Sequence, residues 1–334
     1  MKEQLDQIIS LMVQQHNASL LPQKHGELEI GTRPTPSPQR TQALVKVTAA
    51  ADWKIIDSGL FFERFPAVLG LDGAGVIHIV GSEVTKFKVG DRVIFQGTFN
   101  PDHGCYQEYA LVDTGLISKI PNNINDDQAS TIPSAAIAAY FDRQRKATVS
   151  SRRELVGRAI RCDAAIQFAR IAGFSPIVTT ASSHHASLLK SLGATHVFDR
   201  DTDAQTVQSA FTVPVSLVFD AISSDVTQPF AFDVLSIPSL VPGARLILLQ
   251  AQTDSLKKKN AAHSVIINQV YGSSEVFQDI GVPFWQKIGQ WIEEGELVSN
   301  RVQLVNGGLT SVPEALRLSR KGVSGVKLVI RPQE

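Results

Sequence analysis

The hydrophobic pattern of this 334-residue chain changes once, and that change constrains its fold most. From about Glu27 to Thr114, short runs such as LVKVTA and GVIHIV alternate apolar and polar residues, and glycines separate them. This pattern is typical of antiparallel strands and predicts a compact β-barrel. From about Ala164 to Val270, unbroken apolar runs such as PIVTT and ARLILL alternate with helical patterns. Strands without alternation are covered on both faces, so this half predicts a doubly wound parallel sheet and an α/β fold.

The C-terminal segment is expected to return to the first domain. A helical pattern, SVPEALRLSRKG, lies there between two strand-like runs, RVQLV and VKLVIRP, and the last run resembles the early strands. A strand is best satisfied by joining a sheet, so residues 290–334 are expected to complete the barrel with 18–141. Residues 164–289 then form the parallel-sheet domain. Residues 142–163 carry seven arginines and lysines and are interpreted as a linker or a degenerate element.

Residues 1–17 are a separate N-terminal extension in this division. Their apolar residues have the spacing of one short amphipathic helix: Leu5, Ile8, Ile9, Met12 and Val13. Charged residues interrupt the segment before any apolar block of the kind that a signal peptide needs. We expect the apolar stripe to dock on the body of the protein, with membrane or partner binding as the alternative.

Composition excludes several classes of protein. The 32 lysines and arginines balance the 32 aspartates and glutamates, so no overall field attracts nucleic acid or an anionic membrane. Cys105 and Cys162 are too few for a disulfide framework or a four-thiolate zinc site. No apolar run approaches the roughly 18 residues that cross a bilayer. We expect a cytoplasmic protein with neither nucleic acid nor membrane as a partner.

Four segments carry a family resemblance. They are FPAVLGLDGAGVIHIVGSEVTKFKVGDRVIFQGTF at 65–99, then YQEYALV, IPNNINDDQASTIPSAAIAAY and LLKSLGATHVFDR. In this order they resemble the medium-chain dehydrogenase/reductase superfamily, and within it the fungal zinc-independent enoyl reductase and quinone oxidoreductase-like branch. The resemblance, from about Lys24 to the C-terminus, implies a GroES-like β-barrel domain plus a Rossmann domain. It also implies a small-molecule substrate and a monomer or homodimer.

The position that holds zinc chemistry in relatives is altered here. Zinc-dependent relatives have Gly-His-Glu where this chain has Gly70-Leu71-Asp72. Leucine cannot coordinate zinc, and neither cysteine has neighbours at the spacing of a zinc site, so we predict no metal. Alcohol–ketone chemistry of the zinc type then lacks its electrophile, whereas hydride addition to an activated C=C or a quinone needs mainly an oriented nicotinamide.

The expected phosphate-binding loop is degraded. Relatives have a loop of the GGxSSVG kind where residues 156–162 read VGRAIRC, and only Gly157 remains of its glycines. Glycines let the backbone approach a pyrophosphate at the helix N-terminus, so their loss predicts weaker cofactor binding. Two explanations stay open: divergence to a weak or non-binding protein, or a mispredicted gene with a misread exon or frame between 142 and 163.

The next strand has features that favour NADPH over NADH. PIVTTAS ends in Thr180-Ala181-Ser182, with no carboxylate for a ribose 2′-hydroxyl and none to repel a 2′-phosphate. Ser182 with Arg200, His184 or Lys190 nearby suits that phosphate, although Ser182 also fits the role of a helix cap. By resemblance, further cofactor contacts fall on Asp52, Thr131, Ala221, Val326 and Lys327. Thr131 is as readily interpreted as a buried structural residue, and Lys327 as an exposed lysine on an edge strand.

No catalytic residue is assigned. Motifs such as HExxH and GxSxG are absent from the sequence, so hydrolase chemistry has no support. Tyr106, Tyr140 and Tyr271 are candidate proton donors, but packed aromatics are the expected role, and water is the alternative donor. The sequence therefore predicts an NADPH-dependent oxidoreductase that transfers hydride to an activated C=C (enoyl) or a quinone without zinc. The alternatives are a trans-acting enoyl reductase of a polyketide synthase and a cofactor-impaired relative that acts as a binding protein.

Overall fold

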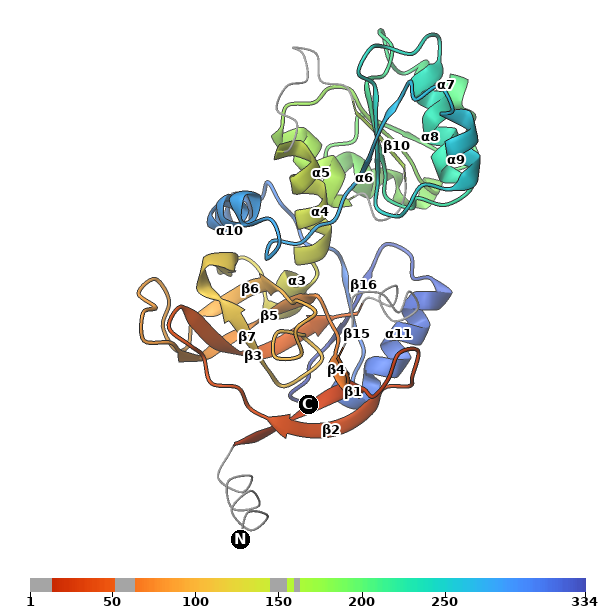
Figure 1. The fold of residues 1–334 in the computed structure, drawn as a ribbon. Coiled ribbons are helices and arrows are strands. Elements are labelled where there is room, and N and C mark those ends of the chain that lie inside the picture. The colour runs from red at the N-terminus through yellow and green to blue at the C-terminus, as the bar shows by residue number, and fades with distance from the viewer. Residues whose placement is uncertain (1–13, 52–63, 145–154, 159–162) are drawn as a thin grey trace. The chain divides into compact units, whose positions relative to one another are not determined.

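The computed structural model describes residues 14–51, 64–144, 155–158 and 163–334, which divide into two compact units (Figure 1). Unit 1 contains residues 1–134, 274–293 and 299–334, and unit 2 contains 135–273 and 294–298. The expected boundaries at 17, 141 and 289 differ from these, and each falls inside a helix or strand. Residue 289 does not separate the units because it lies in helix α10 (Gln278–Glu293), which packs against strand β8 of unit 1.

Unit 1 is built around a seven-stranded sheet with the order β15-β16-β3-β5-β6-β8, and β7 also pairs with β3. Its strands are β3 (Gln42–Ala50), β5 (Asp72–Val80), β6 (Arg92–Gln96), β7 (Tyr109–Asp113), β8 (Ile117–Lys119), β15 (Val302–Leu304) and β16 (Lys327–Ile330). The C-terminal strand β16 pairs antiparallel with β3, so Val329 faces Ala50 across more than 270 residues of chain. This pairing brings both ends of the chain into one sheet, as the sequence predicted.

A small sheet and short helices complete unit 1. The small sheet has the order β2-β1-β4, formed by β1 (Gln15–Leu21), β2 (Glu29–Pro34) and β4 (Ala67–Val68). The helices are α3 (Asp126–Ser130), α10, α11 (Val312–Lys321), η1 (Thr114–Leu116) and η3 (Gly308–Ser311), and α4 (Pro133–Gln144) begins here. Inward-facing aliphatic and aromatic side chains such as Val47, Ile77 and Phe95 form the core with α11 residue Leu316. The apolar residues of the period-two pattern therefore form the buried face of this barrel.

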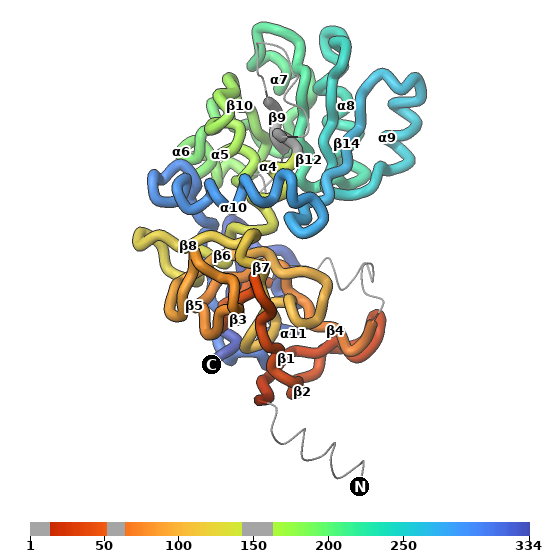
Figure 2. The backbone as a smooth tube through the Cα atoms, turned by 60° about the vertical axis from the view of Figure 1, so that its left-hand side comes forward, coloured from red at the N-terminus to blue at the C-terminus, as the bar shows by residue number. Residues whose placement is uncertain are grey.

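Unit 2 is a six-stranded, wholly parallel sheet with the order β11-β10-β9-β12-β13-β14. Its strands are β9 (Leu155–Arg158), β10 (Ile177–Thr180), β11 (His196–Phe198), β12 (Leu217–Asp220), β13 (Arg245–Leu248) and β14 (Ile266–Gln269). Its other elements are α5 (Asp163–Ile171), η2 (Ser183–His185), α6 (Ala186–Leu192), α7 (Ala204–Gln208), α8 (Thr227–Ser236) and α9 (Asp254–Lys259). Helices α5 and α6 cover one face and α7, α8 and α9 the other (Figures 1 and 2).

This order confirms the predicted doubly wound sheet. Numbered along the chain, this order is 3-2-1-4-5-6, which is the order of a Rossmann fold, and the strand order reverses between β9 and β12. Buried aliphatic residues of the strands, such as Val178, Val218 and Leu246, pack against the helices. Among the residues that the structure describes, no helix is long and apolar enough to cross a membrane.

Candidate functional site

The carboxyl ends of β9, β10 and β12 meet at the point where the strand order of unit 2 reverses. Open α/β sheets bind ligands outside this edge, so it is the candidate cofactor site. Gly157 does not lie in the loop there, as the sequence analysis placed it, but inside β9, where it pairs with Thr179 and Phe219. The described part of this strand covers Leu155–Arg158. The rest of the expected loop, residues 159–162, lies outside the described residues.

The end of β10 brings a cation and a hydroxyl together. The Arg200 guanidinium, which follows β11, donates to the Ser182 hydroxyl, which follows β10. Ser182 makes no capping hydrogen bond to the helical turn that follows it, so the alternative role as a helix cap is not observed. The Thr180 hydroxyl is buried and has no hydrogen-bond partner within the described chain. This corner thus offers a positive charge and an unused buried hydroxyl, with no carboxylate between Thr180 and Ser182.

The end of β12 is held by a buried carboxylate. Asp220 is fully buried, and its Oδ1 accepts hydrogen bonds from the backbone N–H groups of Ile222 and Ser223 at 3.0 and 2.9 Å. Its Oδ2 accepts from the Thr227 hydroxyl at 2.6 Å, at the first residue of α8. Ser223 adopts a left-handed backbone with φ of 56°. Asp220 therefore shapes the tight turn that presents the buried Ala221 at the edge of the sheet.

Unit 1 has a buried ion pair at the start of β5. Asp72 is 1% exposed, and its Oδ2 lies 2.6 Å from the Nζ of Lys327 at the start of β16. Its Oδ1 accepts a hydrogen bond of 2.7 Å from the backbone N–H of Ser134, in the first turn of α4. A carboxylate at the N-terminus of a helix also interacts favourably with the positive end of the helix dipole. Asp72 thus joins three segments that are far apart in the sequence.

Thr131 lies in the same cluster and is completely buried. Its hydroxyl donates to the Gln128 carbonyl at 2.8 Å and accepts from the Asn300 backbone N–H at 3.1 Å. Its carbonyl accepts from the Asn300 side chain at 2.8 Å and from the Lys327 ammonium at 3.3 Å. Thr131 therefore has a structural role, because its hydroxyl and its carbonyl are both hydrogen-bonded within unit 1. Lys327 is a half-buried partner of Asp72 rather than an exposed edge residue.

Thr131 and Lys327 were singled out separately from the sequence, whereas the Lys327 ammonium contacts both the Thr131 carbonyl and the Asp72 carboxylate, which was not predicted. One signal for this was present: Asp72 and Lys327 each begin an otherwise apolar strand, and charges in such positions have to be paired. Val326 is half-buried beside Lys327, and Asp52 lies outside the described residues. Tyr106 and Tyr140 are buried, whereas Tyr271 is exposed. No three His, Cys, Asp or Glu side chains gather into a metal-binding group within the described ranges.

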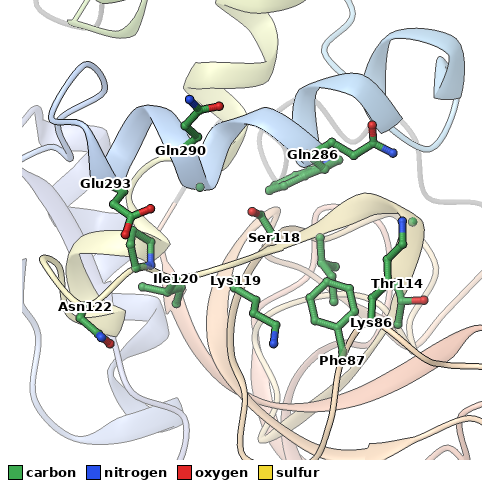
Figure 3. Close-up of a pocket in the computed structure, with 15 residues that line it drawn as sticks. Lys86, Phe87, Thr114, Ser118, Lys119, Ile120, Asn122, Gln286, Gln290 and Glu293 are labelled. Carbon is green, nitrogen blue, oxygen red and sulfur yellow. The ribbon is translucent and has the colours of Figure 1, made fainter.

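Two of the cavities among the described residues of unit 1 involve the region around β8 and α10. A groove of about 490 Å³ runs between β8 and α10, with Lys86, Phe87 and Lys119 on one side and the α10 side chains Gln286 and Glu293 on the other (Figure 3). Lys119 forms an ion pair with Asp91 at 2.8 Å. The second cavity measures about 290 Å³ and includes the imidazole of His103.

Comparison with known proteins gives two matching family models. Residues 39–122 match the alcohol dehydrogenase GroES-like domain, and residues 163–261 match the zinc-binding dehydrogenase model. The chain is 31% identical to the trans-enoyl reductase tndF of Aspergillus flavipes, over 96% of this chain and 99% of that protein.

Solved structures with the same fold have lower identity. A putative zinc-dependent alcohol dehydrogenase protein from Rhizobium etli is 21% identical with a TM-score of 0.82, over 95% of this chain and 98% of the other. A mycobacterial protein in complex with NADPH is 20% identical with a TM-score of 0.74, over 94% of this chain and 99% of the other. These structures support the two-domain architecture described above.

Proposed function

Because the chain belongs to the medium-chain dehydrogenase/reductase superfamily, in its enoyl reductase-like branch, we propose that it is an NADPH-dependent enzyme that reduces an activated C=C double bond without zinc. The observation that carries the choice of cofactor is the Arg200–Ser182 pair beside the carboxyl end of β10. A guanidinium binds phosphate oxygens in a planar, two-pronged geometry, and a hydroxyl adds a further hydrogen bond. That corner therefore suits a ribose 2′-phosphate.

The residues present fit a dinucleotide at this edge of unit 2. Thr180 supplies a buried hydroxyl that lacks a partner in the described chain, which leaves a hydrogen bond for a ligand to complete. The residues of unit 2 that would hold the cofactor are Thr180, Ser182, Arg200 and Ala221, whereas the assignment of Thr131, Val326 and Lys327 in unit 1 rests on the family resemblance alone. When bound, NADPH supplies the hydride and the protein supplies its position and electrostatic surroundings.

The donor set in unit 1 does not suit catalytic zinc. Leu71 stands where zinc-dependent relatives have histidine, and both carboxylate oxygens of the neighbouring Asp72 are already bound. A catalytic zinc site needs three protein ligands and one open position. Leu71 and the Asp72–Lys327 ion pair do not supply such a set of ligands. Reduction of a C=C conjugated to a carbonyl then relies on positioning, which is the chemistry named for the relative from Aspergillus flavipes.

Nucleotide binding followed by turnover tests the proposal. Purified protein is melted with NADPH, with NADH and without ligand, and NADPH oxidation is then followed with a trans-2-enoyl thioester and with a benzoquinone. We expect a rise in Tm with NADPH, because a ligand at about 100 times its Kd stabilises the folded state by about 2.7 kcal/mol. We expect turnover with the thioester. Turnover with the quinone alone would reassign the substrate class.

A non-catalytic binding protein is the second candidate. Its support is the degraded loop, of which only Gly157 remains, in a position inside β9. A cooperatively melting protein whose Tm is unchanged by either nucleotide would favour this candidate and overturn the first.

A further inference from the structure

The carboxyl edge of the parallel sheet in unit 2 has two halves. The first half is formed by β11, β10 and β9 and the second by β12, β13 and β14, and each half of such a sheet accommodates one mononucleotide. The Arg200–Ser182 pair, assigned above to the ribose 2′-phosphate, belongs to the first half. A dinucleotide that spans the point of reversal therefore places its nicotinamide mononucleotide half beside the loops that follow β12 and β13.

These two loops are joined by one buried side chain, Gln228, at the second position of α8. Gln228 is fully buried, and its Nε2 donates to the carbonyls of Ser223 at 3.0 Å and Ala251 at 2.8 Å. Its Oε1 accepts from the Thr253 N–H at 2.9 Å. Ser223 belongs to the loop after β12, whereas Ala251 and Thr253 belong to the loop after β13. Gln228 therefore bridges the two loops through their backbones, and both ends of its amide are used.

The Ser223 hydroxyl makes a second connection between the same loops. It donates to the Asp220 carbonyl at 2.7 Å and accepts from the Leu249 N–H at 2.8 Å. Loops are ordinarily more mobile than the strands that they follow, whereas a buried polar network whose members are satisfied makes the backbone rigid. The two bridges therefore hold the loops after β12 and β13 in one arrangement.

The connected loops present an apolar side chain and free backbone to solvent. Ile222 is 43% exposed, although its neighbours Ala221 and Ser223 are both buried. Gln250 and Ala251 of the other loop are exposed as well. Ligand sites combine apolar side chains with a few backbone polar groups, and the face of an uncharged dihydronicotinamide ring suits an aliphatic side chain. The position of Ile222 thus depends on a turn that the bridges hold in place.

We propose that Gln228 is a positioning residue for the cofactor, and that it holds the loops after β12 and β13 in the arrangement that receives the nicotinamide mononucleotide half of NADPH. This inference rests on the proposed function. Gln228 is fully buried, so it acts through the backbones of Ser223, Ala251 and Thr253. Without the bridge the loops populate other arrangements, and the apparent Kd rises as the fraction of the binding-competent arrangement falls.

The test measures the binding of two nucleotides by titration calorimetry. NADPH contains the nicotinamide half, whereas adenosine 2′,5′-bisphosphate has the 2′-phosphate but lacks that half. We expect Gln228→Leu to raise the Kd for NADPH about tenfold, the change that follows when about a tenth of the molecules keep the competent arrangement. The Kd for adenosine 2′,5′-bisphosphate should equal that of wild-type protein, because this nucleotide occupies the first half of the edge alone.

Asn260 supplies the matched control, because it makes the same kind of bridge at the opposite edge of the sheet. Asn260 is buried, and its side-chain amide donates to the Val265 carbonyl and accepts from the Val265 N–H, both at 2.9 Å, just before β14. Asn260→Leu should lower the Tm, as Gln228→Leu does, and should leave both Kd values unchanged. A merely structural role for Gln228 predicts this same result for Gln228→Leu.

Ser223→Gly tests the same connection if Gln228→Leu does not fold. Glycine adopts the φ of 56° at this position without strain, so the variant loses the hydroxyl bridge to Leu249 and keeps the turn. The Kd for NADPH should again rise, to a smaller extent because the Gln228 bridge remains. The Kd for adenosine 2′,5′-bisphosphate should again be that of wild-type protein.

Unchanged NADPH affinity in the folded variant, or an equal loss of affinity for both nucleotides, would overturn the inference and leave the proposed function intact. Failure of wild-type protein to bind NADPH would overturn the proposed function and the inference with it.

Discussion

Asp72 of unit 1 and Asp220 of unit 2 are both almost completely buried at one end of a strand, but they are satisfied in different ways. The Ile222 and Ser223 N–H groups and the Thr227 hydroxyl, which donate to the Asp220 carboxylate, are neutral and lie within seven residues along the chain. Asp72 binds Ser134, which is 62 residues away, and the cation of Lys327, which is 255 residues away. One carboxylate shapes a local turn, whereas the other closes the tertiary structure of its unit. Removal of the two carboxylates should therefore lower the free energy of unfolding by different amounts. The nearby partners of Asp220 are easier to predict from the sequence than the distant partners of Asp72.

The largest effect is expected from Asp72→Ala. It leaves the half-buried Lys327 without its counter-charge and the Ser134 N–H without an acceptor, so the free energy of unfolding should fall by about 3–5 kcal/mol. Urea unfolding of the variant measures this loss. The double variant Asp72→Asn with Lys327→Met should recover part of it, because no unpaired charge remains. Equal instability of the single and double variants would contradict the role of charge.

The Arg200–Ser182 pair of unit 2 is exposed, and its loss should affect binding rather than stability. Arg200→Ala should weaken NADPH about 10- to 100-fold, because a charge-assisted hydrogen bond contributes roughly 1.5–3 kcal/mol. The affinity for NADH should change little. Titration calorimetry with both nucleotides gives the ratio of the affinities for NADPH and NADH. Lys190→Gln on the exposed face of α6 is the matched control. An equal loss for both nucleotides would show that Arg200 does not distinguish them.

Asp220→Asn tests the other half of the comparison. The amide oxygen still accepts from the Ile222 and Ser223 N–H groups, and the Thr227 hydroxyl can rotate to accept from the new NH₂ group. The free energy of unfolding should therefore fall by only about 1 kcal/mol. Asp72→Asn, which removes the charge opposite a lysine, should cost clearly more in the same urea assay. A reversal of this order would break the distinction between local and long-range carboxylates.

The smallest effect concerns His16, whose bond to Gln107 is also long-range in sequence. Burial lowers the pKa of His16, so the folded state prefers the neutral ring. The stability that depends on this ring is fully present above the unfolded-state pKa near 6.5 and is lost as pH falls through the lower folded-state pKa. Between about pH 8 and pH 5, the Tm of wild-type protein should fall more steeply than that of His16→Gln. If the Tm of the two proteins falls equally with pH, His16 does not contribute to the loss of stability in acid.

Local patterns predicted much of the molecule. The period-two runs became the strands of unit 1, the continuous apolar runs became the parallel strands of unit 2, and the last strand joined the first sheet. Segment boundaries were predicted less well, since Gly157 was assigned to a loop and lies in a strand. That error arose because a family spacing was carried onto a stretch rich in charged residues.

The candidate site was only partly predictable for a related reason. Ser182 and Arg200 were correctly associated because they end neighbouring strands of a parallel sheet. Asp72 went unrecognised as the partner of Ser134 and Lys327 because its contact with Lys327 depends on the long-range pairing of β5 with β3 and of β3 with β16. The cavity lined by His103 and Glu275 is likewise assembled from segments more than 170 residues apart, so it could not be predicted from the sequence.

The sequence by itself determined the two fold types, the chemistry of the end of β10 and the turn around Asp220, because each depends on residues close along the chain or on a simple periodicity. The tertiary structure alone decided that Asp72 pairs with Lys327, that the Thr131 hydroxyl is used for packing and that His103 lines a cavity. Periodicity reports which face of an element is buried but not which distant residue it meets. That partner is chosen only when the sheet forms, when a buried charge has to find its opposite or remain unpaired at high cost.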